Sequence, residues 1–119
     1  MKQAGFGSAG NPDSFYAAGF KASVEMPAWL RAQGLDAYEY QCSRGVTIRE
    51  GTARAIGDAA RTHGVRLSIH APYFINLATE DETIAGNTKR HFLKSLGVAR
   101  WMGADRVVFH IGGPGKQPR

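Results

Sequence analysis

The chain has 119 residues, of which 43% are hydrophobic and 21% charged, as in one ordinary soluble globular domain. Its single cysteine, Cys42, cannot form an internal disulfide, and neither a signal peptide nor a run of about 18 apolar residues is evident, so we expect a cytoplasmic protein rather than a secreted or membrane protein. The net charge of +5 would suit nucleic-acid binding, but the basic residues are scattered, and a scattered surplus more often serves solubility.

Helices that end at a glycine alternate with short apolar or aromatic strands along the chain. The expected elements are a glycine-rich strand within 4–10, a turn at 11–14, a helix over 26–33, a strand over 35–42, a helix over 47–63, a strand from 65 to 70, a helix over 79–102 and a strand over 105–110. Ala53, Ile56 and Ala60 have the spacing of a buried helix face. In the last helix, one broad buried face is expected from Ile84, Leu93, Leu96, Ala99 and Met102.

The order strand–helix–strand, repeated along the chain, is typical of βα units in a right-handed parallel sheet. A complete eight-stranded barrel needs roughly 200–250 residues. We therefore expect residues 1–119 to form a single α/β domain, about the first four βα units of an incomplete TIM-type barrel, with 111–119 as an irregular tail. Such an open sheet would expose its edges and apolar strand faces. The sequence thus predicts a missing carboxyl-terminal half, or pairing with another copy or another polypeptide.

Two strands are each followed by a histidine where the strand should end. His70 is followed by Ala-Pro, and His110 by Ile-Gly-Gly-Pro. Neutral imidazole is a common metal ligand, and the carboxyl ends of neighbouring parallel strands meet at one mouth of a barrel. His70 and His110 are therefore candidate metal ligands; the alternative, that each is a buried histidine bonded to a carbonyl, stays equally open from spacing alone.

Other polar residues are expected close to that mouth. Arg44 follows the second strand and has the chemistry to bind a phosphate, or it is a solvated loop arginine. Tyr73 and Asn76 lie just beyond His70; the tyrosine can stack on a base or bond a phosphate oxygen, or merely cover the barrel rim. Glu39 lies inside a strand, where a carboxylate needs a partner. No histidine near Cys42 in sequence would activate its thiol, which argues against a nucleophile.

The string Ser-Ile-His70-Ala-Pro-Tyr73-Phe-Ile-Asn76-Leu resembles the motif around the first histidine of the endonuclease IV family, the type 2 AP endonucleases. Val-Val-Phe-His110 resembles that family's strand-four motif, although the family continues with Pro-Gly where this chain has Ile111-Gly112. The resemblance implies a TIM barrel with a trinuclear zinc site that hydrolyses the phosphodiester 5′ of an abasic site in DNA. His70 and His110 would be zinc ligands, and Arg44, Tyr73 and Asn76 would be DNA-contact residues.

The family's later metal ligands, on strands five to eight, have no counterpart in this sequence, so we expect the chain alone to be inactive. A histidine-rich ligand set would also accept manganese or iron. Two further interpretations stay open. One is a sugar isomerase or epimerase of the same superfamily, with a single divalent metal and no need of Arg44. The other is a non-catalytic half-barrel that dimerises. The string at His70 favours the nuclease.

Overall fold

The computed structural model describes residues 3–113 and contains one sheet of four strands, in the order β1-β2-β3-β4. All neighbouring strand pairs are parallel. The elements are β1 (Gly7–Ala9), α1 (Asp13–Ala17), the single-turn 3-10 helix η1 (Ser23–Glu25), α2 (Met26–Ala32), β2 (Ala37–Gln41), α3 (Glu50–His63), β3 (Arg66–His70), α4 (Glu82–Met102) and β4 (Arg106–Val108). The parallel βα architecture expected from the sequence is confirmed.

The predicted helix ends agree with the structure because a glycine ends each of the two long helices. Gly64 and Gly103 follow α3 and α4 with φ of 67° and 72°, the left-handed conformation that glycine adopts without strain. The predicted strands are longer than the observed ones; β2 and β4 are each three residues shorter than predicted, and β4 ends at Val108 rather than at residue 110. The short helix α1 and η1 were not predicted; α1 begins inside the stretch expected as a turn.

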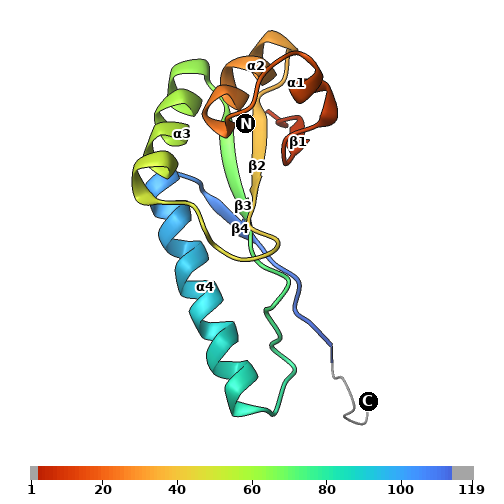
Figure 1. Cartoon of the computed structure of the whole chain (residues 1–119), viewed down its shortest axis with the longest axis vertical. Helices are drawn as coiled ribbons and strands as arrows, with labels where there is room; N and C mark the ends of the chain where they lie inside the picture. The colour runs from red at the N-terminus through yellow and green to blue at the C-terminus, as the bar shows by residue number, and fades with distance from the viewer. Residues whose placement is uncertain (1–2, 114–119) are drawn as a thin grey trace.

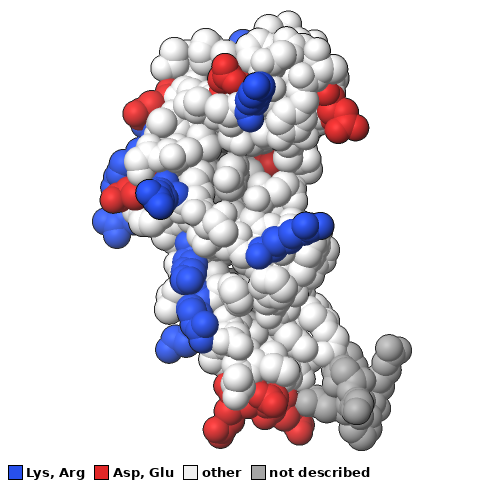
Figure 2. Space-filling view, viewed as in Figure 1, with Lys and Arg blue, Asp and Glu red and all other residues white. Residues whose placement is uncertain are grey.

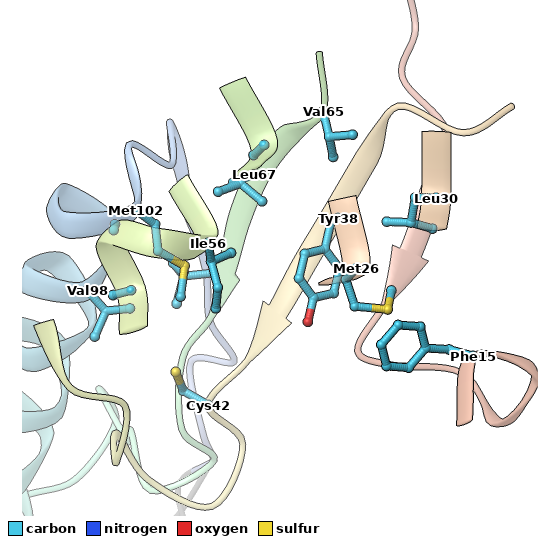
Figure 3. Packing of buried hydrophobic residues seen from close by; sticks show 14 residues of the cluster. Phe15, Met26, Leu30, Tyr38, Cys42, Ile56, Val65, Leu67, Val98 and Met102 are labelled. Carbon is cyan, nitrogen blue, oxygen red and sulfur yellow. The ribbon is translucent and has the colours of Figure 1, made fainter. Parts of the chain in front are cut away.

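The core lies between the sheet and the helices on one of its faces. Figure 1 shows α3 and α4 on the same side of the strands, with α3 above and the blue carboxyl end of α4 meeting it. In Figure 3, Tyr38 from β2 points towards Met26 and Phe15, while Ile56, Val98 and Met102 pack together where α3 meets α4. The predicted α3 face, Ala53, Ile56 and Ala60, is fully buried. Burial of such side chains contributes roughly 1.5–3 kcal/mol for each large aliphatic residue.

The other face of the sheet is open and mostly polar. Along β3, Leu67 and Ile69 are buried towards the helices, whereas Arg66, Ser68 and His70 alternate with them and stay partly accessible. The register places Glu39 of β2 beside Ser68, and Gln41 beside His70. The expectation of exposed apolar strand faces is therefore wrong for this face, because successive strand residues point to opposite sides and most of the polar ones fall here.

The prediction for α4 is wrong in part. Ala99 and Met102 are buried as expected, and so is Val98, but Leu93 and Leu96 are 58% and 52% exposed, and Ile84 is also exposed. Periodicity identifies an apolar face but not whether another element covers it. Residues 111–113 have no regular secondary structure; the rest of the predicted tail, 114–119, lies outside the described residues. No helix of the described chain is long and apolar enough to cross a membrane.

Candidate metal centre

His70 is the last residue of β3, and strand pairing on both sides fixes its backbone. Its register partners are Gln41 in β2 and Val108 in β4. Beyond the strand end, the Cys42 N–H donates to the His70 carbonyl at 2.9 Å, and the Ala71 N–H donates to the Val108 carbonyl at 2.8 Å. Pro72 lacks an N–H and cannot extend the ladder. The imidazole of His70 is therefore held at the carboxyl end of the sheet.

The His70 ring contacts a carboxylate rather than a carbonyl. Its Nδ1 lies 3.1 Å from Glu39 Oε1, and the two side chains are only 13% and 21% exposed. The other ring nitrogen, Nε2, is buried and has no hydrogen-bond partner among the described residues. Such an orphaned nitrogen is uncommon, since buried polar atoms are nearly always paired, and a neutral imidazole nitrogen of this kind suits a metal ion.

His110 and Tyr73 complete a cluster of three rings at this point. The centroid of the His110 ring lies 5.2 Å from that of His70, and the Tyr73 ring lies 6.0 Å from His70 and 5.9 Å from His110. His110 follows the end of β4 and is exposed, as is Tyr73. The alternative of a buried, carbonyl-bonded residue is therefore wrong for His110. The two histidines expected at the mouth do lie next to each other.

Residues 3–113 do not assemble a complete metal site. No group of three or more histidine, cysteine, aspartate or glutamate side chains within them is placed to hold a metal ion. Glu39 contacts His70 through Nδ1, whereas the unpaired ring nitrogen of that histidine is Nε2. Because a zinc site takes about three or four ligands, the two imidazoles fit as part of a ligand set that further side chains must complete.

The loops after β2 and β3 lie against each other beside the rings. The Tyr73 N–H donates to the Ser43 carbonyl at 3.0 Å, which brings Arg44 to the same end of the sheet. The Arg44 side chain is exposed and makes no hydrogen bond or ion pair with any described residue. It is thus accessible to a ligand, and its predicted contact with a phosphate stays a prediction.

Asn76 is engaged within its own loop. Its Oδ1 accepts the Ala78 N–H at 3.0 Å, and its backbone N–H donates to Thr88 Oγ1 of α4 at 3.0 Å. A Cβ on Gly112 would lie 2.6 Å from Asn76 Oδ1, so this loop and the segment after β4 touch where only glycine fits. These contacts support a structural role for Asn76, and its DNA contact stays a prediction.

The charges do not by themselves mark a nucleic-acid surface. In Figure 2, basic side chains lie along α4 and at scattered points over the face shown, and acidic ones gather at the lower end, where α4 begins. A concavity of about 660 Å³ on the open sheet face is lined by Glu39, Arg66, Ser68 and Arg106, with neither His70 nor His110 among its lining residues. The candidate site is therefore defined by the histidine rings rather than by this hollow or by a basic patch.

Comparison with known proteins decides the family. The model of the xylose isomerase-like TIM barrel family matches residues 27–119. The chain belongs to this family. No protein among those with curated descriptions gives a significant match.

Two solved structures share the fold of this xylose isomerase-like TIM barrel chain. Endonuclease IV from Thermus thermophilus superposes with a TM-score of 0.59 at 24% identity, covering 76% of this chain and 35% of the other. D-psicose 3-epimerase, solved in the presence of D-fructose, gives a TM-score of 0.67 at 17% identity, covering 83% of this chain and 36% of the other. The chain thus spans about a third of the length of either, and at these identities the likeness concerns the fold.

Within a xylose isomerase-like TIM barrel, the open polar face is the one that lines the barrel interior. Glu39 lies on that face and contacts His70, a partnership that the sequence did not reveal. In the sequence, Glu39 is an isolated carboxylate within a strand, and it is this carboxylate that needs a partner. The alternation of side chains along a strand could have indicated this contact, because Glu39 and Gln41 point to the same face of β2. The sequence alone does not give the β2–β3 register, which places that face beside His70.

Proposed function

We propose that this chain forms part of the catalytic centre of a zinc-dependent, endonuclease IV-like phosphodiesterase that acts on DNA at abasic sites. The observation that carries the proposal is the adjacent pair of imidazoles at the carboxyl ends of β3 and β4, with the buried Nε2 of His70 unpaired among the described residues. The string from His70 through Tyr73 to Asn76 supports the nuclease over other members of the family.

The residues present fit a zinc ion as two of its ligands. His70 Nε2 and the His110 ring would hold it, and the half-buried setting of His70 keeps competing water away from that nitrogen. When bound, zinc lowers the pKa of a coordinated water to about 7 and stabilises negative charge on a phosphate. Manganese or iron would also accept imidazole ligands, so the choice of zinc rests on the resemblance.

Arg44 and Tyr73 are the residues proposed to contact DNA. The free guanidinium of Arg44 can donate two charge-assisted hydrogen bonds to a phosphate. The exposed ring of Tyr73 lies beside both imidazoles, where its face can stack on a base next to the abasic site and its hydroxyl can bond a phosphate oxygen. Both side chains would orient the scissile phosphate towards the ring cluster.

We infer that the missing ligands come from further βα units that pack against β4. Between α4 and β4 lies a groove of about 510 Å³, bordered by apolar residues that include Phe92, Leu96, Val107 and Phe109. A right-handed crossover from β4 would place a helix over this groove and a parallel strand at the free edge of β4. A second copy of the chain could offer β1 to that edge, but none of its described helices would follow β4 to cover the groove.

The second candidate is a sugar isomerase or epimerase with one divalent metal. It is favoured by a carboxylate, Glu39, on the barrel-interior face next to His70. Such an enzyme would have no use for the exposed Arg44. Binding to DNA therefore separates the two candidates.

The test compares the binding of two DNA duplexes, one that carries a single abasic analogue and the same duplex intact, with and without zinc. Binding is measured by fluorescence anisotropy at fixed salt. We expect zinc to give the chain at least a several-fold preference for the abasic duplex. The variant His70→Ala should lose this preference, because it removes a zinc ligand. Arg44→Ala should weaken the binding of both duplexes, because it removes a phosphate contact whose charge-assisted hydrogen bonds are worth about 1.5–3 kcal/mol.

Exposed residues outside the ring cluster provide the matched controls. His63→Ala at the end of α3 and Arg100→Ala on α4 should retain the preference. Equal binding of the two duplexes by the unaltered chain, with or without zinc, would contradict the DNA contacts proposed for Arg44 and Tyr73 and make the sugar enzyme the better candidate.

A further inference from the structure

A row of hydrogen-bonded side chains leads from the loop after β2 to His70. Ser43 Oγ donates to Gln41 Oε1 at 3.0 Å, and Gln41 Nε2 donates to Glu39 Oε1 at 2.6 Å. Glu39 Oε1 in turn lies 3.1 Å from His70 Nδ1. All four side chains are partly buried on the barrel-interior face or at its end.

The chemistry of the row fixes the direction of its last hydrogen bond. An ionised carboxylate only accepts hydrogen bonds, so the partner nitrogen of His70 must carry a proton. A neutral imidazole has one protonated nitrogen, and with Nδ1 protonated the lone pair resides on Nε2. That nitrogen is the buried one without a partner among the described residues.

We propose that Glu39, held in place by Gln41 and Ser43, is a positioning residue that keeps His70 in the Nδ1–H form, with Nε2 oriented to bind the metal. This inference rests on the proposed function in one respect, namely that the group bound by Nε2 is a metal ion. A carboxylate that accepts the second N–H of a ligating histidine fixes its tautomer and ring orientation and raises its basicity. Loss of such a partner typically weakens metal binding by about 10- to 100-fold.

The β2–β3 register explains why Glu39 can act in this way. Gln41 lies directly beside His70, and Glu39 lies two residues earlier on the same face. The Gln41 amide therefore stands next to both residues, and its N–H fixes the carboxylate oxygen that faces the ring. Ser43, just beyond the strand, holds the amide oxygen and so orients the amide.

The experiment measures the His70 tautomer in the metal-free chain by long-range ¹H–¹⁵N correlation NMR at about pH 8.5, where an unperturbed imidazole is neutral. His70→Ala assigns the signals. The unaltered chain should show Nδ1 protonated and Nε2 unprotonated. Glu39→Ala should shift His70 towards the Nε2–H form and weaken zinc binding, measured by competition with a chelating dye, by at least about 10-fold.

Two further variants separate positioning from a general effect on the fold. Glu39→Gln keeps an acceptor oxygen of the same reach and should retain more of the native tautomer and affinity than Glu39→Ala. Glu50→Gln, which alters an exposed carboxylate paired with Arg54 on α3, should change neither. An unaltered His70 tautomer in Glu39→Ala, or an Nε2–H form in the unaltered chain, would overturn the proposal.

The outcomes also separate this inference from the proposed function. If zinc binds and Glu39→Ala leaves both tautomer and affinity unchanged, the positioning role fails while the metal site stands. If the tautomer shifts in Glu39→Ala but the affinity for zinc does not change, Glu39 orders a histidine that is not a metal ligand, and the proposal is overturned together with His70's proposed role.

Discussion

Cys42 is buried just beyond β2, 3% exposed, in the core beneath the candidate site. Burial raises the pKa of its thiol to about 11. Because only the thiolate is nucleophilic, almost no reactive form exists near neutral pH in the folded chain. The absence of a role for Cys42 as a nucleophile, expected from its sequence surroundings, agrees with this environment.

Modification of Cys42 by a thiol-reactive dye should therefore report unfolding. At about pH 8 we expect slow labelling of the native chain and labelling at least about 10-fold faster in urea, where the pKa of the thiol returns to about 9. Folding raises the pKa of the Cys42 thiol, so the protonated thiol favours the folded state at neutral pH. This contribution to the free energy of unfolding is lost as pH rises from about 9 through 11. The chain has one cysteine, so a single rate is measured. Fast labelling of the native chain at pH 8 would contradict the burial.

At the same scale, the sequence identifies the chemical groups of the candidate site but not their pairing. His70 ends β3 and His110 follows the end of β4 by two residues; because parallel strands end at one edge of a sheet, their proximity could be predicted. The contact between Glu39 and His70 could not, because it depends on the register of two strands about 30 residues apart in sequence. The engagement of Asn76 with Ala78 and Thr88 likewise arises from the packing of a loop on α4.

At the scale of elements, α4 divides into a covered and an uncovered apolar side. Met102 is 1% exposed and packs in the core, while Leu96 on the same helix is half exposed. In urea unfolding, we expect Met102→Ala to lower the free energy of unfolding by about 2–5 kcal/mol. Leu96→Ala should change it by no more than about 0.5 kcal/mol, since it removes few contacts. Equal losses would mean that another surface covers Leu96 in solution.

The carboxyl ends of α3 and α4 could be read from the sequence because glycine is a local signal, whereas the strands are shorter than predicted and both helices begin three residues later, at Glu50 and Glu82. The burial of each face could not be read from the sequence, since it depends on what packs against it. The prediction for α3 is correct because the described chain surrounds its apolar face with α2, α4 and the sheet. The prediction for Leu93 and Leu96 is wrong because no described element packs over either side chain: Leu96 borders the open groove between α4 and β4, and Leu93 lies outside it.

At the scale of the molecule, the sheet is a segment of a barrel wall with β1 and β4 at its edges. Next to β4, the Phe92 and Phe109 rings stack edge to face, with centroids 4.6 Å apart, at the apolar groove over which a further helix would lie. Exposed apolar surface of this kind usually marks a place where another polypeptide segment packs. The further βα units proposed above would cover this groove and also complete the ligand set.

The last prediction concerns this surface in the chain by itself. We expect sedimentation velocity at micromolar concentration to show a monomer, because a second copy would leave the groove without a covering helix. The apolar dye ANS should bind the chain, and the variant Leu96→Lys, which places a charge in the groove, should bind clearly less while keeping its helix content by circular dichroism. Thr83→Lys, an exposed site at the start of the same helix, adds charge away from the groove and should bind dye as the unaltered chain does. A compact dimer that excludes the dye would instead show that two copies close the barrel, with β4 of each paired to β1 of the other and the histidines of both facing one interior.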